Sequence, residues 1–334
     1  MLAVDVGGTT TPAGLVTSDG EVLLQRQMPT HSSGPGTAGA TIGTLLDEVR
    51  HGAGGAHALA AIGVGVAAVV DAAAGVVGEE AHNVPELAGL PLAATLSARF
   101  GLPAFIDNDV NALALAEWRF GIARGARSLV VLAPGTGFGS GIVLDGRLIR
   151  GARGFGAELG HVPVKFDGPP CWCGGRGCLA LYAGARGIVE AARARAATPD
   201  GRALLAAAGG DALRIDTPFV FHRAADGDPA AIAVVDEACR ALGAMVGIVI
   251  NGLNPEIIVI TGGVAAAFAV LEARVLAAAA EYAFERALAA TRIVIAPGDK
   301  GSSMRGAGAL AFYELEWRAA GRRGAGAPPS EASL

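Results

Sequence analysis

A repeated local pattern most constrains the fold of this 334-residue chain. In each copy a short apolar strand leads into a turn rich in Gly and Thr and then resumes as a second apolar strand. The first copy covers residues 2–6 and 7–10, and the second covers residues 128–133 and 135–141. Helical patterns follow both copies, which indicates a duplicated α/β architecture with a cleft between the copies, into which the strand ends point.

The rest of the chain alternates between the apolar spacing of helices and that of strands. Apolar spacing predicts helices over 37–51, 92–100, 110–120, 181–197, 229–253 and near 306–319, and strands at 12–17, 21–27, 59–66, 103–106, 142–144, 257–260 and 292–296. We expect an N-terminal lobe over 1–110, with the last helix packed back on it, and a larger C-terminal lobe over 111–305. The Gly-, Pro- and Ser-rich residues 320–334 predict a disordered tail.

Charge and hydropathy exclude several classes of protein. The formal charge of -5 argues against a nucleic-acid partner, which usually requires a basic face. The first residues lack the positive charge of a signal peptide and place an acid at Asp5, and no apolar run reaches the ~20 residues of a membrane span. We therefore expect a cytoplasmic protein that does not contact a membrane.

Three glycine turns each follow an apolar strand. Glycines allow backbone N–H groups to approach phosphate oxygens, and an acid at a strand end can hold Mg²⁺. Each turn by itself is more often a plain reversal of the chain, but three at strand ends together favour a nucleotide site. The candidate residues for ATP and Mg²⁺ are Asp5, Gly7, Gly8, Thr9, Thr10, Gly135, Thr136, Gly137, Gly262 and Gly263.

A second candidate site lies where a short strand turns into a helix, at Asp107, Asn108 and Asp109. Carboxyl and amide groups in this position could bind sugar hydroxyls and accept a proton, as phosphoryl transfer requires. The alternative is a helix cap, because Asp and Asn are favoured at helix starts. We expect one of the three residues to serve as the cap.

A metal site is predicted by His161 together with Cys171, Cys173 and Cys178. One imidazole and three thiolates complete a tetrahedral Zn²⁺ site with no open position, so the metal would be structural. The alternative is three unrelated thiols, but the chain has only four cysteines, and clustered cysteines in a reducing compartment favour a metal over a disulfide. Zinc at His161 would also fix Glu158, three residues earlier.

These motifs resemble those of the ROK family, which groups bacterial sugar kinases with related transcriptional repressors. The resemblance covers residues 2 to about 311. It is most specific over 156–179, where the spacing of the GAELGH and CWCGGRGC segments is that of the family's zinc motif. Residues 5–9 resemble the family's DxGGT, residues 108–111 its NDxN, and residues 135–141 its GTGxGxG.

The resemblance implies an actin-like ATPase (ribonuclease H-like) fold, two-lobed with an interlobe cleft, often in a homodimer or homotetramer. It implies that Asp109 is the general base and that the three glycine turns hold ATP. It assigns the sugar hydroxyls to Asn83, Asn108, Glu158 and His161, with His161 also binding zinc.

Four positions depart from the family pattern. Thr10 replaces the usual Lys, Ala67–Ala68 replaces Pro-Gly, and Ala157 replaces a Gly. Ala180 replaces the Glu that binds hydroxyls around the anomeric carbon, so a charge-assisted hydrogen bond of ~1.5–3 kcal/mol is missing.

These departures leave several functions open. The first is a glucose-class kinase acting on the 6-hydroxyl of a hexose, and the second, which Ala180 favours, is a kinase of a C7 cyclitol or another sugar analogue. A non-catalytic sugar-binding protein and a repressor are the alternatives without turnover. Asp5 lies too close to the start to leave room for a repressor's helix-turn-helix, and the retained Asp109 favours an enzyme.

Overall fold

The computed structural model describes residues 1–55, 58–298 and 301–319, and it divides into two compact units. Unit 1 contains Met1–Arg127, Gly141–Ala157 and the described residues after 300, and unit 2 contains Ser128–Ser140 and Glu158–Gly298. This division differs from the sequence-based boundaries at 110 and 305, because the helix after residue 108 packs on the last helix of the chain and stays with unit 1. The predicted tail, 320–334, lies outside the described residues.

Unit 1 is built on a five-stranded sheet with the order β3-β2-β1-β4-β7. Its strands are β1 (Leu2–Val6), β2 (Thr10–Val16), β3 (Val22–Pro29), β4 (Ile62–Val66) and β7 (Ala104–Asn108). The first three pair antiparallel, whereas β4 is parallel to both β1 and β7. A small hairpin, β5 (Val70–Asp71) with β6 (Val76–Val77), and the short helix η1 (Pro85–Leu87) complete this part.

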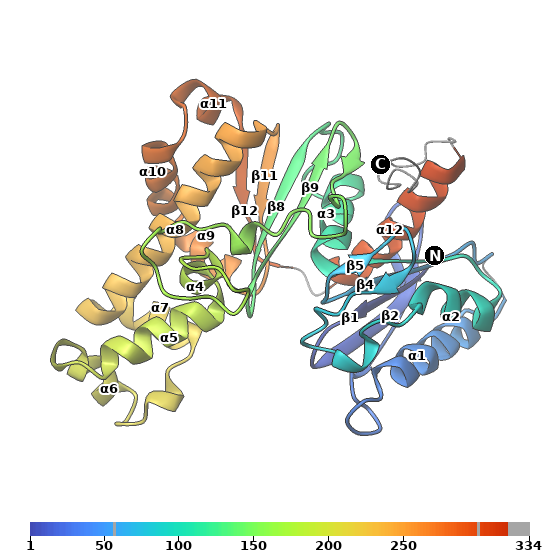
Figure 1. Ribbon diagram of the computed structural model, residues 1–334, viewed down its shortest axis with the longest axis horizontal. Helices are drawn as coiled ribbons and strands as arrows, with labels where there is room; N and C mark the ends of the chain where they lie inside the picture. Colours follow the sequence, from blue (N-terminus) through green and yellow to red (C-terminus); the bar gives the residue numbers. More distant parts are fainter. Residues whose placement is uncertain (56–57, 299–300, 320–334) are drawn as a thin grey trace, which may run out of the picture. The chain divides into compact units, whose positions relative to one another are not determined.

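Helices cover both faces of this sheet (Figure 1). On one face lie α1 (Ala38–Gly52) and α2 (Leu92–Phe100), and on the other lie α3 (Asp109–Arg119) and α12 (Ser302–Ala319). Strand β1 shows the alternation directly: Leu2 and Val4 belong to the core with α1, whereas Ala3 packs with Met304 of α12. Side chains therefore alternate between two apolar layers, as the period of a strand requires.

Unit 2 contains the strands β8 (Leu129–Pro134), β11 (Ile257–Ile260) and β12 (Arg292–Ile295), which pair in parallel. The full order of this sheet is β10-β9-β8-β11-β12. Strand β9 (Phe138–Leu144) passes from unit 2 into unit 1, where its last residues pair with β10 (Arg147–Leu148). The predicted strand 142–144 therefore begins earlier, at Phe138, inside the glycine-rich segment.

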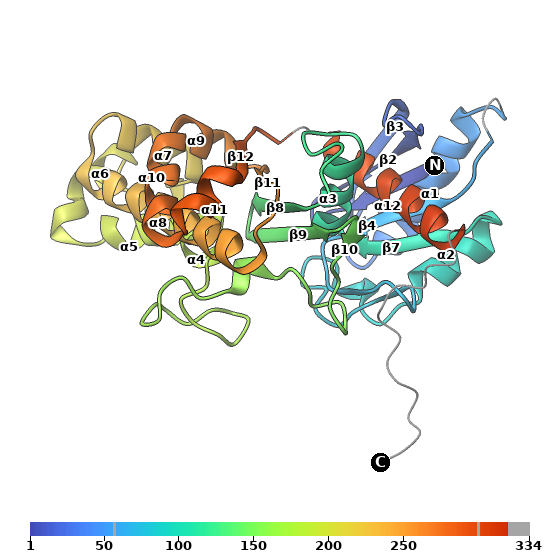
Figure 2. The ribbon, with the colours of Figure 1, turned by 90° about the horizontal axis from the view of Figure 1, so that it is seen from above.

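Helices make up most of unit 2, with α8 among α5, α7 and α10 (Figure 2). The α-helices are α4 (Ala180–Ala183), α5 (Ala185–Ala196), α6 (Arg202–Ala207), α7 (Thr217–Ala225), α8 (Pro229–Leu253), α9 (Ala265–Val270), α10 (Glu272–Tyr282) and α11 (Glu285–Ala290). Short 3₁₀ helices are η2 (Leu159–His161), η3 (Pro199–Gly201) and η4 (Ala212–Arg214). Among the described residues, no helix combines the length and apolar character that a bilayer crossing requires.

The ends of α8 follow from its sequence. Asp228 accepts the backbone N–H groups of Ala230 and Ala231 at 3.0 and 3.1 Å, and Pro229 occupies the first turn. Asn254 ends the helix in the left-handed conformation, with φ of 44°. The predicted helix 181–197 is instead two helices, because the backbone of Gly184 between them is extended, with φ of -85° and ψ of 152°.

Helix α12 lies close against strand β4. A Cβ atom at Gly63 would lie 1.8 Å from the carbonyl oxygen of Ala307, so only glycine allows the helix to pack here. We predict that Gly63→Ala lowers the free energy of unfolding by about 2–4 kcal/mol, because α12 must shift. Gly252→Ala in α8 is the control, since its Cβ would meet nothing within 4 Å. Equal loss of stability in both variants, measured by denaturant unfolding, would contradict this packing.

Candidate active site

The parallel register of unit 1 brings two acids to one edge of its sheet. Asp5 of β1 pairs with Gly65 of β4, which pairs with Asp107 of β7. A Cβ atom at Gly65 would lie 3.4 Å from both Oδ1 of Asp5 and Cα of Asp109. Gly65 therefore leaves the space in which Asp5 and the start of α3 come together. The sequence analysis missed this glycine, which the register of β4 identifies.

Asp5 also contacts the C-terminal helix. Burial raises the pKa of the Asp5 carboxyl group, and a hydrogen bond with Ser303 of α12 partly offsets this rise. A cation near the carboxyl group would favour its ionised form, which fits the expected role near Mg²⁺. Ser303 was not predicted, because no local motif connects a residue of the last helix with the first strand.

The first glycine turn, residues 7–10, is held from two sides. The hydroxyl of Thr30 donates to the carbonyl oxygen of Gly7 at 2.6 Å, and the N–H of Thr30 donates to the carbonyl oxygen of Thr9 at 2.9 Å. A Cβ atom at Gly8 would lie 3.1 Å from Cβ of Asn83, so Asn83 lies against the turn. Gly8, Thr9 and Thr10 are exposed, and Thr10 begins β2. The turn is thus fixed in shape while its outer surface stays accessible.

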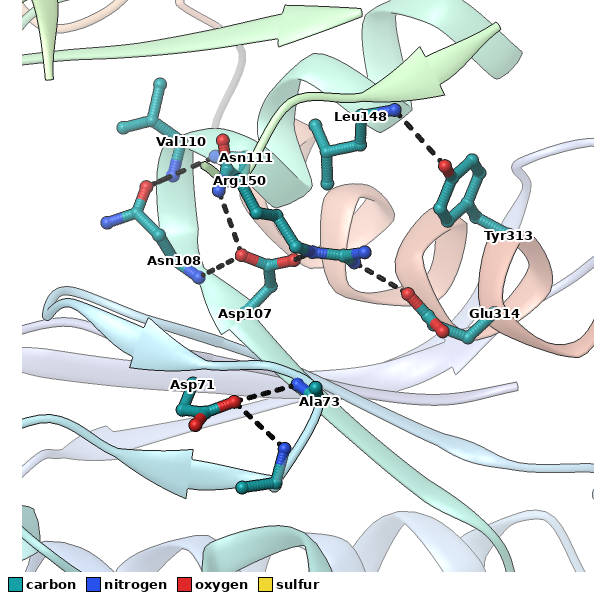
Figure 3. Close-up of polar contacts among 11 residues, drawn as sticks. Asp71, Ala73, Asp107, Asn108, Val110, Asn111, Leu148, Arg150, Tyr313 and Glu314 are labelled. Carbon is teal, nitrogen blue, oxygen red and sulfur yellow. Dashed lines mark hydrogen bonds and ion pairs between the residues drawn. The ribbon is translucent and has the colours of Figure 1, made fainter. Parts of the chain in front are cut away.

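The three residues of the acid cluster have separate roles, and Figure 3 shows two of them, Asp107 and Asn108. Asn108 is the helix cap: its Oδ1 accepts the N–H groups of Val110 and Asn111 at 2.9 and 3.2 Å, and its Nδ2 donates to the carbonyl oxygen of Ala68 at 3.2 Å. Asp107 is only 1% exposed, so it cannot meet a substrate. Asp109, the first residue of α3, is partly exposed, and its Oδ1 accepts the N–H of Val110 at 3.0 Å.

Unit 2 brings the other two glycine turns together. Gly135–Gly137 follows β8 and Gly262–Gly263 follows the neighbouring parallel strand β11. The N–H of Val264 donates to the carbonyl oxygen of Pro134 at 2.9 Å, and a Cβ atom at Gly262, where φ is 140°, would lie 2.7 Å from that oxygen.

The turn at Gly135–Gly137 is also tied to the start of α5. The N–H groups of Ala185 and Arg186 donate to the carbonyl oxygens of Gly135 and Thr136 at 2.9 and 3.1 Å. A Cβ atom at Gly135 or Gly137 would meet nothing within 4 Å. The turn therefore presents open backbone, the kind of surface that a phosphate can approach.

The four predicted metal ligands meet in unit 2. Their ligand atoms lie within 4.8 Å of one another, with 3.7 Å between the sulfurs of Cys173 and Cys178 and 3.7 Å between Nδ1 of His161 and the sulfur of Cys171. Zn–S bonds of about 2.3 Å at tetrahedral angles separate two sulfurs by about 3.8 Å. The donor set and its spacing both fit Zn²⁺.

The electrostatics of this cluster also fit a cation. Burial and the neighbouring thiols raise the pKa of Cys178 to about 12. Burial alone would raise the pKa of Cys173, but the hydrogen bonds to this residue outweigh burial. The bond with the backbone of Gly175 contributes most among them, and the pKa of Cys173 lies below its usual value. Burial lowers the pKa of His161, which favours the neutral imidazole that a metal binds. A divalent ion would stabilise the three thiolates that otherwise repel one another.

Glu158 lies three residues before the first ligand, His161, at the start of η2. The N–H of Leu159 donates to the hydroxyl of Ser140 at 3.0 Å, and the N–H of His161 donates to the carbonyl oxygen of Glu158 at 3.0 Å. Burial raises the pKa of Glu158. The preceding Ala157 has φ of 66°, a left-handed conformation that costs an alanine about 1 kcal/mol relative to glycine. The departure from Gly at this position therefore stores strain beside the candidate site.

The predicted residues thus group by unit. Unit 1 holds Asp5, Gly7, Gly8, Thr9, Thr10, Asn83, Asn108 and Asp109, and unit 2 holds Gly135, Thr136, Gly137, Glu158, His161, Cys171, Cys173, Cys178, Gly262 and Gly263. Ala180, the departure at the expected sugar-binding Glu, is the partly exposed first residue of α4, two residues after the ligand Cys178.

Comparison with known proteins gives consistent matches along the chain. The sequence profile of the ROK family matches residues 1–314. A glucokinase from Thermotoga maritima is 35% identical over 272 residues, which cover 81% of this chain and 84% of the relative. The ROK-family glucokinase of Streptomyces griseus, solved with glucose and AMPPNP, is 30% identical with a TM-score of 0.75, covering 93% of this chain and 99% of that one.

A structure from the regulatory branch of the family is also similar. A ROK-family transcriptional regulator, a homologue of the E. coli MLC protein, is 28% identical with a TM-score of 0.79, covering 94% of this chain and 78% of that one. Kinases and a regulator thus share this fold. The α/β, actin-like fold class expected from the sequence is confirmed.

The metal cluster yields a direct prediction. We expect about one zinc per chain in the purified protein, because four protein ligands close the site. Cys178→Ser should lose most of the zinc and lower the melting temperature, whereas Cys239→Ala, a buried cysteine of α8 outside the cluster, should retain it. Metal analysis that finds no zinc in the parent protein, or equal zinc in both variants, would contradict the site.

Proposed function

Because this chain belongs to the ROK family, we propose that it is an ATP-dependent kinase of the 6-hydroxyl of a glucose-class hexose. In this proposal Asp109 is the general base. The observation that supports this role is that the three residues of the acid cluster lie in different environments. Asp107 is buried, Asn108 caps α3, and Asp109 is the partly exposed carboxyl group at the helix start.

The proposed reaction moves one proton and one phosphoryl group. Asp109 accepts the proton of the acceptor hydroxyl while the hydroxyl oxygen forms a bond to the γ-phosphorus of ATP. The bond between that phosphorus and the β–γ bridging oxygen breaks, and ADP leaves with the electron pair. Because phosphoryl transfer depends mainly on alignment and charge neutralisation, the rigid start of α3 suits a base.

The glycine turns would hold the phosphates of ATP. In unit 2 the turns at Gly135–Gly137 and Gly262–Gly263 lie beside each other, and their backbone is open at Gly135, Gly137 and Gly263. In unit 1 residues 7–10 form an exposed turn next to Asp5. Mg²⁺, when bound, would neutralise phosphate charge, with Asp5 as its protein partner, usually through water. A nucleotide complex of a relative, the AMPPNP-bound glucokinase, supports ATP as the donor.

Asn83, Asn108, Glu158 and His161 are the proposed partners of the acceptor's hydroxyl groups. His161 and the three cysteines would hold a structural Zn²⁺ that fixes the short helix η2 and with it Glu158. The family members named glucokinase, one of them solved with glucose, support a glucose-class acceptor.

Ala180 favours a second candidate, a kinase of a C7 cyclitol or another sugar analogue. A side chain that ends at Cβ cannot hydrogen-bond the hydroxyls around an anomeric carbon. An acceptor without the usual hydroxyl groups around an anomeric carbon would lose less binding free energy when the Glu is replaced by Ala180. An ATP-consumption screen against hexoses, N-acetylhexosamines and cyclitols separates the two candidates, and glucose turnover well above all others would exclude the cyclitol.

The role of Asp109 is tested by Asp109→Asn, which keeps the size of the side chain and removes the base. We expect kcat to fall roughly 10²–10⁴-fold, because that is the usual contribution of a general base. The melting temperature should stay close to that of the parent protein, since the amide oxygen can still accept the N–H of Val110. Activity within several-fold of the parent would refute Asp109 as the base.

The role of position 180 is tested by restoring the acid. We predict that Ala180→Glu raises kcat/KM for glucose roughly ten-fold or more, because a charge-assisted hydrogen bond contributes about 1.5–3 kcal/mol. Ala180→Gln is the matched control, with a similar size and no charge, and should give a smaller gain. No gain for glucose in either variant would show that Ala180 does not set the acceptor preference.

A further inference from the structure

We propose that Arg150 and Glu314 are positioning residues for the base, Asp109, and that they act through Asp107. The inference rests on the proposed function, because it assumes that Asp109 takes the proton. Neither residue belongs to the glycine turns, the acid cluster or the metal cluster. Arg150 lies just after β10, and Glu314 lies on α12 (Figure 3).

Asp107 receives three hydrogen bonds on its two oxygens. Oδ1 accepts the N–H of Asn108 at 2.8 Å and Nδ2 of Asn111 at 2.9 Å, and Oδ2 accepts Nε of Arg150 at 2.6 Å. The bond to Asn108 spans a single residue, so it fixes the peptide that leads toward Asp109. A movement of the Asp107 carboxyl group would therefore turn the start of α3.

Arg150 joins this carboxyl group to the last helix. Its NH2 group donates to Oε1 of Glu314 at 2.6 Å, while its Nε holds Asp107. Burial alone would lower the pKa of Arg150, but Asp107 and Glu314 raise it above its ordinary value. The arginine therefore stays charged and binds both acids through donors whose relative positions its planar guanidinium group fixes.

A second contact aligns the same segment with α12. The N–H of Leu148 donates to the hydroxyl of Tyr313 at 3.1 Å, and the ring of Tyr313 lies 5.8 Å from the guanidinium carbon of Arg150. Residues 148 and 150 are thus both tied to adjacent residues of one helix. This arrangement leaves Arg150 little freedom to follow Asp107 if the acid moves.

Asn111 supports a role beyond filling space. Its Nδ2 donates to Asp107, whereas its Oδ1 is buried and has no hydrogen-bond partner among the described residues. An unpaired buried acceptor is unfavourable, so the amide is oriented for its bond to Asp107 despite that cost. Three hydrogen bonds thus fix the carboxyl group of Asp107, while Oδ1 of Asn111 stays without a hydrogen bond among the described residues.

A brace that serves only stability would behave differently, and the chain offers a matched control. Arg119 of α3 binds Glu316 of α12 through two hydrogen bonds of 2.8 and 2.7 Å. This pair connects α3 with α12 two residues away from Glu314, and it does not contact Asp107. Glu316→Gln therefore removes an arginine–glutamate pair on the same helix, more exposed than that of Arg150, without disturbing the proposed network.

The experiment compares Arg150→Lys, Glu314→Gln and Glu316→Gln in the full-length chain. We expect Arg150→Lys to lower kcat roughly ten- to hundred-fold, because a misplaced reacting group affects the chemical step. The KM for ATP and the KM for the acceptor should change little. Glu314→Gln should lower kcat several-fold, and Glu316→Gln should leave it unchanged. Melting temperatures identify any variant that fails to fold. If Arg150→Lys does not fold, the conservative Glu314→Gln still tests the network.

A double-variant cycle separates positioning from general damage. If Arg150 acts through the base, Arg150→Lys should reduce turnover by less than about three-fold in a chain that already carries Asp109→Asn. An equal further loss in that background would overturn the inference, as would parental kcat in Arg150→Lys and Glu314→Gln or an equal loss in Glu316→Gln.

The outcomes also distinguish the two proposals. A loss of kcat in Asp109→Asn with parental kcat in Arg150→Lys and Glu314→Gln would overturn the positioning role alone. Parental activity in Asp109→Asn would overturn the base, and the positioning role with it.

Discussion

Unit 1 depends on the close approach of its last helix to a sheet face that carries little side-chain volume. Gly63 of β4 faces the backbone of α12, and Gly306 of α12 faces α3, where a Cβ atom would lie 2.7 Å from the backbone of Ala112. Larger residues would push the helix away from the sheet and the acids. The close packing brings Ser303 to Asp5 and places Glu314 within reach of Arg150. The polar contacts at the sheet edge therefore depend on small residues as well as on charge.

At the same edge of the sheet, two residues that are close in sequence have different roles. Asp107 and Asp109 are both aspartates, yet one lies in strand β7 and the other begins helix α3. Burial and an arginine fix the first, while the second stays partly exposed. Two identical side chains thus differ in role because the change from strand to helix turns them in different directions.

The sequence predicted the longer strands of both sheets, the helices α1, α3, α8 and α12 and the metal cluster, because these features have local signatures. The short strands β5, β6 and β10 and the helices α6, α7, α9 and α11 were not predicted. Continuous apolar runs identified β1 and β11, and the spacing of the cysteines identified a cluster that the structure brings together. Gly65, Arg150, Ser303 and Glu314 could not be found in this way. Their importance arises from strand register and from contacts such as that of Arg150 with Glu314, which lie 164 residues apart, so no local pattern reveals them.

Chain order has a consequence for biosynthesis. Unit 2 is formed by residues 128–140 and 158–298, whereas unit 1 needs α12, which begins at Ser302. Domains generally fold as they emerge from the ribosome, from the N-terminus onward. The first residues made must therefore wait for the last helix before their sheet is covered on both faces, while unit 2 has all its residues earlier. The nascent chain thus leaves the face that α12 will cover, where only α3 lies, exposed to solvent until the end of translation.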